Sequence, residues 1–136
     1  MAINTPAPDP LRGLGQVMDE ISKHSHHWGL QVSPRGFMLA HYNLNGSRHH
    51  LHVDGGKGTP YCPQCNSATR RLTTIAYLND EVWPSQFGGQ LRSYLCGGQV
   101  DISPTGGKLV VFPAQLIWHE VLPSWKQRFA LTAWLH

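Results

Sequence analysis

The sequence contains little charge and no long apolar run. Only 14% of its 136 residues are charged, with 11 basic residues against 8 acidic ones. Basic residues stand side by side only at Arg70 and Arg71, so the clustered basic surface typical of nucleic-acid-binding proteins is missing. No stretch approaches the roughly 20 apolar residues of a transmembrane helix. The sequence therefore argues against a nucleic-acid partner and against a membrane partner.

Cysteine is also scarce, and the N-terminus shows no secretion signal. The chain has 3 cysteines, and residues 1–10 lack the basic start and apolar run of a signal peptide. These features predict reduced thiols and a cytoplasmic location. Three prolines without an apolar pattern predict a flexible tail over residues 1–10. Residues 11–136 have the length of one domain, and a hydrophobic content of 40% is enough for a globular core.

One helix and many short strands are expected. Leu14, Val17, Met18 and Ile21 form an amphipathic stripe, which predicts a helix over residues 11–25 that packs one face on a sheet. About eight short strands are predicted near residues 37–44, 49–53, 71–78, 90–95, 99–102, 109–112, 116–122 and 127–135. Gly-Gly pairs mark several of the turns between them. This pattern is typical of a β-sandwich, jelly roll or barrel.

Three residues form a candidate metal site. His52 and Asp54 are two apart, so both point to the same face of a strand. His119 interrupts an apolar segment, where an imidazole is solvent-facing, hydrogen-bonded in the core, or a metal ligand. Two imidazoles and one carboxylate leave half of an octahedron open, as non-haem Fe(II) oxygenases require. His50 and His52 are a rival pair at the same spacing.

The last predicted strand carries an unusual mixture of side chains. By strand parity, one face of residues 128–134 holds Arg128, Thr132 and Trp134, whereas the other face is wholly apolar. A guanidinium offers a two-pronged grip on a carboxylate, so this face suits a lumen that holds an acid. The alternative is an arginine that reaches solvent at a strand end. Tyr77 alternates in the same manner, and an inward Tyr77 needs a polar partner for its hydroxyl.

Six segments follow the order and spacing of a known enzyme family. They are Tyr42–Gly46, His52–Asp54, Thr73–Asn79, Gly88–Arg92, His119–Val121 followed by Pro123, and Arg128–Trp134. In these segments the chain resembles the prolyl 4-hydroxylase family of 2-oxoglutarate- and Fe(II)-dependent dioxygenases. Within that family it is most similar to the intracellular oxygen-sensing (HIF-type) prolyl hydroxylases and their microbial relatives. The resemblance covers most of the chain, from about residue 40 to residue 135.

The resemblance implies a mainly β fold, a double-stranded β-helix (jelly roll) with one N-terminal helix packed on a sheet. It makes His52, Asp54 and His119 the ligands of Fe(II), and it gives Arg128 the distal carboxylate of 2-oxoglutarate. Further residues that it places around this co-substrate are Tyr77, Thr73, Tyr42, Leu91, Val121 and Trp134. Residues that it places near the substrate are Arg70, Ile75 and Trp134. The co-substrates would be 2-oxoglutarate and O2, with ascorbate as a supporting reductant.

The implied activity is hydroxylation of an unactivated C–H bond, with succinate and CO2 as co-products. A prolyl residue in a protein or peptide is the first choice of substrate. The alternatives are the same chemistry on a free amino acid, small molecule or nucleobase, and a shortened jelly roll that binds a metal or partner without catalysis. The segment before Tyr42 is shorter than in relatives. This predicts a minimal enzyme, a shortened form of a longer protein, or a homodimer that covers an exposed face.

The segment over residues 55–69 reads as a loop and contains the sequence Cys62-Pro63-Gln64-Cys65. A C-x-x-C pair supplies half of a structural zinc site. No second half is evident, since Cys96 is a lone third cysteine, and the remaining candidate ligands are His24, His26 and His27. An oxidisable or intersubunit pair and an ordinary reduced loop are the alternatives for Cys62 and Cys65.

Overall fold

The chain folds into a mainly β structure with one long helix. The computed structural model describes the backbone of residues 10–59, 62–66 and 69–136, and the side chains of residues 12–34, 36–56 and 69–136. Helix α1 (Pro10–His24) is followed by the short 3-10 helix η1 (Ser25–Trp28). The strands are β1 (Pro34–Tyr42), β2 (Ser47–His52), β3 (Lys57–Thr59), β4 (Cys62–Asn66), β5 (Leu72–Tyr77), β6 (Leu91–Leu95), β7 (Gly98–Ile102), β8 (Leu109–Pro113), β9 (Trp118–Ser124) and β10 (Arg128–Leu135), with the 3-10 helix η2 (Ser85–Phe87) before β6.

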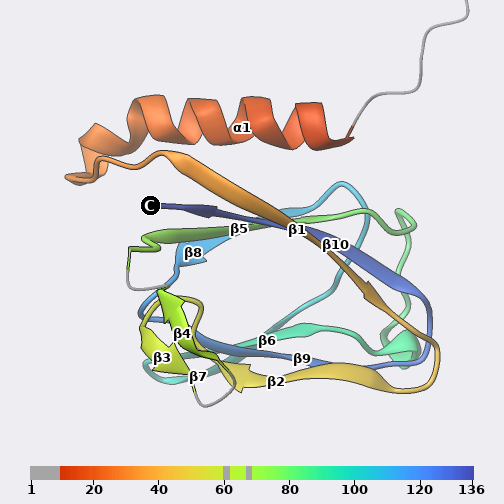
Figure 1. The fold of residues 1–136 in the computed structure, drawn as a ribbon. Coiled ribbons are helices and arrows are strands. Elements are labelled where there is room, and N and C mark those ends of the chain that lie inside the picture. The colour runs from red at the N-terminus through yellow and green to blue at the C-terminus, as the bar shows by residue number, and fades with distance from the viewer. Residues whose placement is uncertain (1–9, 60–61, 67–68) are drawn as a thin grey trace, which may run out of the picture.

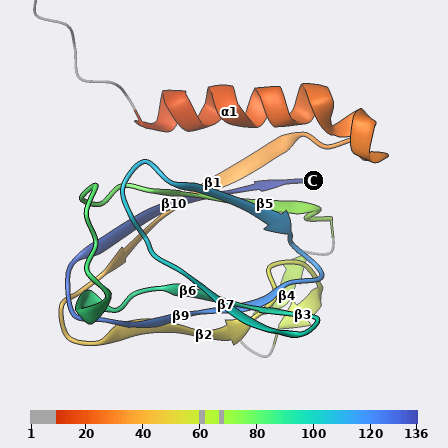
Figure 2. The ribbon, with the colours of Figure 1, turned by 180° about the vertical axis from the view of Figure 1, so that it is seen from behind.

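Eight strands form two antiparallel sheets that face each other. The first sheet has the order β1-β10-β5-β8, and the second has the order β2-β9-β6-β7. Helix α1 covers the outer face of the first sheet, and the second sheet lies on the opposite side (Figures 1 and 2). The predicted jelly roll with one helix on a sheet is therefore confirmed. Within the described ranges, no helix has the length and apolar character needed to cross a bilayer.

The strand parity of β10 divides its side chains between two environments. Leu131 and Ala133 face α1 and pack in one core cluster with Leu14 and Met18. The alternate residues of β10 face the second sheet, as the predicted alternation requires. A second core cluster lies between the sheets and consists of Ile75, Tyr77, Leu91, Phe112, Val121 and Ala130. One strand thus connects the packing of the helix to the space between the sheets.

The structure corrects the prediction for residues 55–69. This segment contains the two-stranded hairpin β3–β4, in which Lys57 pairs with Asn66 and Thr59 with Cys62. Glycine and proline content suggested a loop, but backbone pairing between two short strands does not depend on an apolar pattern. The other predicted strands are present, with ends shifted by a few residues. The predicted tail lies outside the described residues except for Pro10, which begins α1.

The buried side chain of Met18 offers a test of how α1 is held. Its exposed fraction is 0%. We expect Met18→Ala to lower the free energy of unfolding by about 2–5 kcal/mol, because truncation leaves a cavity against the sheet. Val17 on the same helix is 38% exposed, so Val17→Ala is the control and should cost less than about 1 kcal/mol. Denaturant titration followed by circular dichroism measures both values. Equal effects would show that α1 does not dock as described.

Candidate metal and co-substrate site

Strand register brings the two candidate histidine ligands together. His52 is the last residue of β2, and in the antiparallel pairing of β2 with β9 it lies directly opposite His119. The two imidazole ring centroids are 4.3 Å apart. His119 is buried, with an exposed fraction of 3%, and its ring also contacts Phe112. The register of an antiparallel pair thus places two imidazoles side by side although they are far apart in the sequence.

Asp54 completes the group from the bend that follows β2. Its Oδ1 atom lies 3.1 Å from His52 Nε2 and 3.6 Å from His119 Nε2. The three potential ligand atoms all lie within 4.8 Å of one another. Among the side chains that the structure describes, no other three His, Cys, Asp or Glu residues meet this criterion. Two imidazoles and one carboxylate on one side of an ion are the ligand set of non-haem Fe(II) sites.

Backbone carbonyls orient both imidazoles toward this point. His52 Nδ1 lies 2.7 Å from His50 O, and His119 Nδ1 lies 3.0 Å from Ile117 O. Because a carbonyl oxygen only accepts hydrogen bonds, each Nδ1 carries the proton in the neutral ring, and each Nε2 keeps its lone pair. Hydrogen bonds of this kind set the tautomer and the ring orientation of metal-binding histidines.

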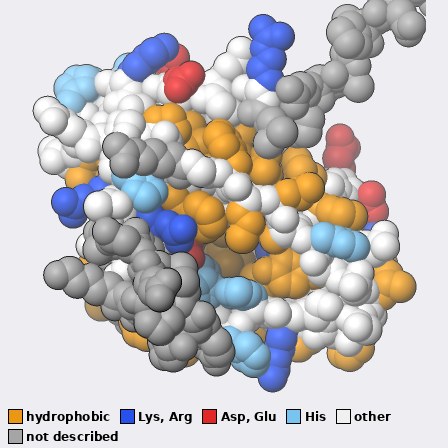
Figure 3. All heavy atoms as spheres, viewed as in Figure 1, with side chains coloured by type: hydrophobic (Ala, Val, Ile, Leu, Met, Phe, Trp, Pro, Cys, Tyr) orange, Lys and Arg blue, Asp and Glu red, His pale blue; other side chains and the backbone are white. Residues whose placement is uncertain are grey.

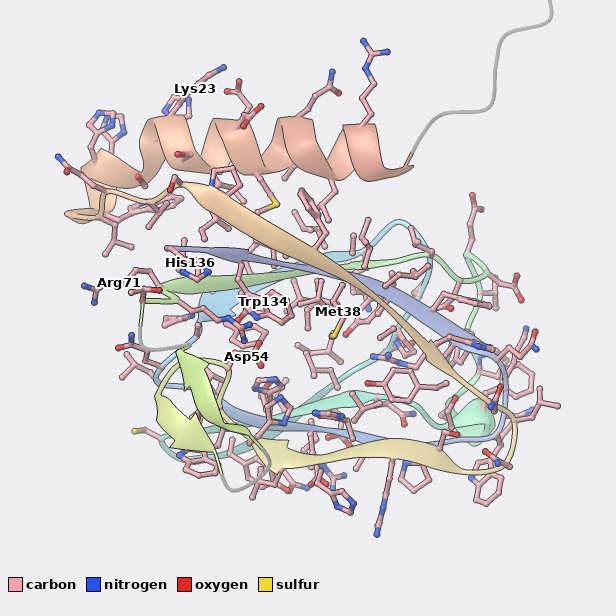
Figure 4. The ribbon with its side chains drawn as sticks, in the orientation of Figure 1. Lys23, Met38, Asp54, Arg71, Trp134 and His136 are labelled. Carbon is pink, nitrogen blue, oxygen red and sulfur yellow. The ribbon has the colours of Figure 1, made fainter. Side chains whose placement is uncertain are left out.

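The outer oxygen of Asp54 is held by two donors. Thr73 Oγ1 donates to Asp54 Oδ2 at 2.7 Å, and Trp134 Nε1 donates to the same atom at 3.2 Å. Arg70 stacks on the Trp134 ring at 3.8 Å and donates from Nη1 to the Asp54 main-chain oxygen at 3.2 Å. In Figure 4, Trp134 extends from β10 toward Asp54. The carboxylate is therefore fixed with Oδ1 turned toward the two histidines.

The electrostatics of the group favour a cation at neutral pH. Burial alone would raise the pKa of Asp54, but the His52 hydrogen bond, the nearby His119 and the Thr73 hydroxyl together lower it to about 2. Burial lowers the pKa of His119. Burial also acts to lower the pKa of His52, but hydrogen bonds to Asp54 and to the His50 carbonyl outweigh it and raise that pKa. The site thus keeps an ionised carboxylate beside two imidazoles.

Arg128 lies at the start of β10 and is almost fully buried, with an exposed fraction of 1%. Its Nε donates to Gly89 O at 2.8 Å, and its Cζ lies 4.7 Å from the Tyr42 ring centroid and 5.1 Å from that of Tyr77. Gly89 has a φ of +72°, and a Cβ there would come within 3.0 Å of Arg128 Cδ and 2.9 Å of Ser124 Oγ. Glycine is therefore required where the backbone meets the arginine.

Two features around Arg128 suit the binding of an anion. No described acidic side chain forms an ion pair with this buried guanidinium, which stays charged in proteins. Tyr77 has an exposed fraction of 1%, and its buried hydroxyl has no hydrogen-bond partner among the described residues. Burial raises the pKa of Tyr77 to about 12, although Arg128 acts in the opposite direction. A buried cation and an unpartnered donor together suit a carboxylate.

A single cavity of about 330 Å³ joins the histidine-aspartate group to Arg128. Apolar side chains form much of its wall, namely Ala40, Ile75, Leu91, Val121 and Ala130. Its mouth lies between β1 and β2, and Figure 3 shows hydrophobic side chains around a hollow with histidines along its lower side. The volume falls within the range of small-molecule sites, which are mostly apolar with a few polar groups that orient the ligand.

The family comparison agrees with this geometry. The family model of the 2OG-Fe(II) oxygenase superfamily matches residues 37–136. The chain belongs to this superfamily. The hypoxia-inducible factor prolyl hydroxylase of Caenorhabditis elegans is 35% identical over 105 residues, which is 71% of this chain and 13% of that protein.

Solved structures of prolyl hydroxylases resemble this chain along most of its length. A prolyl 4-hydroxylase from Pseudomonas putida has a TM-score of 0.75 and 29% identity, covering 98% of this chain and 69% of that one. A prolyl hydroxylase from Trichoplax adhaerens, in complex with a hypoxia-inducible factor peptide fragment, has a TM-score of 0.76 and 27% identity, covering 92% and 55%. The oxygenase spans only part of the length of the relatives that it matches.

The donor set of this member of the superfamily fits Fe(II) and 2-oxoglutarate. His52, Asp54 and His119 would supply nitrogen and oxygen ligands to the iron. The unpaired Arg128 and the unpartnered Tyr77 hydroxyl suit the distal carboxylate. Leu91, Val121, Tyr42, Ile75 and Trp134 line the same cavity, as the resemblance implies. Thr73 differs, because its hydroxyl is engaged by Asp54 and it does not line the cavity.

The structure also brings in residues that the sequence did not single out. His49 and Arg48 line the cavity, and the His49 ring lies 4.5 Å from that of His52. The pairing of β2 with β9 is irregular between His49 and His52, so His49 rather than His50 joins His52 at the cavity. A period of two cannot reveal such an irregularity. The side chains of Cys62 and Cys65 lie outside the described residues, so the zinc prediction stays untested.

The role of Thr73 in this oxygenase can be measured through the metal. Thr73→Val keeps the shape of the side chain but removes the donor to Asp54 Oδ2. We expect Mn(II) affinity to fall by about 10-fold or more, as is usual when a partner of a metal ligand is lost. Thr74→Val is the control, because the Thr74 hydroxyl donates to the Ala133 carbonyl instead. Isothermal titration calorimetry measures both. An unchanged affinity in Thr73→Val would mean that Asp54 is oriented without this bond.

Proposed function

We propose that this oxygenase hydroxylates a C–H bond with Fe(II), O2 and 2-oxoglutarate, and that its substrate is a prolyl residue in a protein or peptide. The observation that carries the proposal is one cavity lined both by a His-Asp-His group and by a buried arginine without an acidic partner, with the unpartnered hydroxyl of Tyr77 next to that arginine. A catalytically inactive jelly roll would have no need to bury an uncompensated cation, because such burial is costly.

Bound Fe(II) supplies the oxidising chemistry, in which one oxygen atom of O2 enters the substrate C–H bond and the other enters succinate as 2-oxoglutarate loses CO2. His52, Asp54 and His119 would hold the metal on one face and leave the opposite face for the co-substrates. Arg128, with Tyr77 and Tyr42 beside it, would hold the distal carboxylate of 2-oxoglutarate. The apolar wall of Ile75, Leu91 and Val121 would exclude water from the reacting groups.

The choice of a prolyl substrate rests on the relatives. Those reported above are prolyl hydroxylases, and the Trichoplax protein was solved with a peptide fragment of hypoxia-inducible factor. The mouth of the cavity lies between two edge strands, where an extended polypeptide can approach. Trp134 and Arg70 lie against Asp54, and Ile75 lines the cavity. These three residues are the proposed substrate contacts nearest the metal.

The deciding experiment is turnover with proline-containing peptides. Iron-loaded protein, 2-oxoglutarate and ascorbate are incubated in air with a peptide library, and succinate and peptide masses are followed. Succinate release with a gain of one oxygen on a proline peptide supports the proposal. If only free amino acids, small molecules or nucleobases gain oxygen, the proposed hydroxylation is supported but the proposed prolyl substrate is wrong.

A non-catalytic role is separated by binding alone. Calorimetry with Mn(II) and 2-oxoglutarate should show metal-dependent binding of the co-substrate, and its absence would favour a jelly roll that binds a metal or partner without chemistry. A homodimer is proposed only as a way of covering a face that the short segment before Tyr42 leaves exposed, and its test is the mass in solution. The cytoplasmic location stays a prediction of the sequence.

A further inference from the structure

The mouth of the cavity has two chemically different sides. Strands β1 and β2 are the terminal strands of their sheets, and both contribute to the cavity. On β1, Met38 lines the mouth and is 45% exposed. On β2, Arg48 and His49 line it. In Figure 4, Met38 points into the space between the sheets, as Trp134 and Asp54 also do. An occupant therefore meets an apolar strand on one side and a basic strand on the other.

Basic side chains outnumber acidic ones around this cavity. Its lining residues include two arginines, Arg48 and Arg128, and four histidines. Asp54 is the one acidic residue among them, and it is engaged by His52, Thr73 and Trp134. The half-buried Arg70 lies just behind, over the Trp134 ring. A bound divalent metal and the dianionic co-substrate would offset each other, which leaves Arg48 as the cation that can attract an anionic group to the mouth.

Arg48 shares with Arg12, Arg71 and Lys108 the lack of an ion pair with a described acidic residue, but of these four exposed residues only Arg48 lines the cavity. Three other basic residues do have an acidic partner. Arg92 is paired with Asp101 at 2.7 Å, Lys23 with Glu20 at 2.6 Å, and Lys126 with Asp80. Arg48 is exposed, and no described acidic residue forms an ion pair with it. The cation at the mouth thus lacks the internal partner that several basic residues have elsewhere. It is free to pair with a ligand.

We infer that the substrate polypeptide carries acidic side chains close to the residue that is hydroxylated, and that Arg48 pairs with one of them while Met38 packs against an apolar neighbour. This inference rests on the proposed function, because it assigns the partner of the same cavity. A nucleic acid is the competing anionic partner. The exposed apolar side chain of Met38 at the mouth suits contact with a peptide better than contact with a phosphate backbone.

The test compares two peptides that differ only in charge. Fluorescein-labelled peptides with a central proline carry either Asp and Glu or Asn and Gln on both sides of it, and binding to protein loaded with Mn(II) and 2-oxoglutarate is followed by fluorescence anisotropy. We expect the acidic peptide to bind about 3- to 10-fold more tightly at low salt, because each exposed ion pair contributes modestly. Raising the salt to about 0.5 M should reduce the preference to less than about 2-fold.

Variants then assign the preference to Arg48. Arg48→Gln should remove most of it, and Arg48→Glu should make the amide peptide the better ligand. Arg12→Glu on α1 changes the net charge equally, outside the cavity, and should leave the preference unchanged. Equal binding of both peptides at low salt would overturn the inference. So would tighter, Arg48-dependent binding of a labelled single-stranded oligonucleotide.

The outcome for substrate choice is separable from the outcome for the reaction. If the amide and acidic peptides are hydroxylated equally well and bind equally well, the proposed activity stands and the acidic preference is wrong. If the acidic peptide binds preferentially but neither peptide supports succinate release, the inferred preference for acidic peptides is supported and the proposed reaction is wrong.

Discussion

Replacing His119 by alanine should lower Mn(II) affinity by more than about 100-fold. The change removes a metal ligand that is 3% exposed, and loss of a mere partner of a metal ligand already costs about 10- to 100-fold. Calorimetry and the electron paramagnetic resonance spectrum of bound Mn(II) both report on this loss. Co-substrate turnover should disappear with it, because His52 and Asp54 alone do not hold the metal on a defined face.

His50→Ala is the matched control for this change. His50 is exposed and lies at the same spacing from His52 as Asp54 does, so the sequence offered it as a rival ligand. The structure places the Asp54 carboxylate, not the His50 ring, beside His52 and His119. Mn(II) affinity should therefore be unchanged within about 2-fold in His50→Ala, since surface substitutions of this kind have small effects. A larger loss in His50→Ala than in His119→Ala would refute the assigned ligand set.

Replacing Arg128 by alanine should leave metal binding intact and abolish 2-oxoglutarate binding. Two charge-assisted hydrogen bonds to a carboxylate contribute about 1.5–3 kcal/mol each, so the affinity should fall by at least about 100-fold. Arg128→Lys keeps the charge but loses the planar fork, and its affinity should lie between that of the alanine variant and that of the unmodified protein. Calorimetry on Mn(II)-loaded protein measures the series.

Two readouts make the Arg128 result specific. Mn(II) affinity serves as an internal control, because Arg128 makes no contact with the metal ligands and its Nε donates to Gly89 instead. Arg92→Ala, at an exposed arginine paired with Asp101, is the external control and should bind 2-oxoglutarate normally. Unchanged co-substrate affinity in Arg128→Ala would mean that the buried guanidinium serves the fold, and that the anion site lies elsewhere.

Strand alternation explains why much of the site was predictable. On β10 a period of two separates Leu131 and Ala133, which pack under α1, from Thr132 and Trp134, which line the cavity. The same rule placed Tyr77 inward, where its hydroxyl lies buried beside Arg128. These assignments depend only on neighbours along one strand. The sequence of a single strand is therefore enough to predict which of its side chains face the cavity.

Contacts between distant segments were not predictable in this way. Thr73 and Trp134 meet Asp54 because three separate segments converge, and nothing in any one of them indicates hydrogen bonds to the same oxygen. The irregular pairing in β2 that brings in His49 depends on the partner strand β9. The hairpin β3–β4 is stabilised by backbone pairing that glycine and proline content concealed. Each miss concerns geometry that arises only when segments pair.

His52 is the last residue of the edge strand β2, and this position affects the stability of the strand. This strand has a hydrogen-bonded neighbour on one side only, and a slip of one residue would turn every side chain to the opposite face. A metal bound by His52 on β2 and His119 on the interior strand β9 would stabilise the pairing of these two strands. Without metal, β2 should fray first, and its amides should exchange with solvent faster than those of β9. The metal ion would then have a second role, which is to hold β2 in its register against β9.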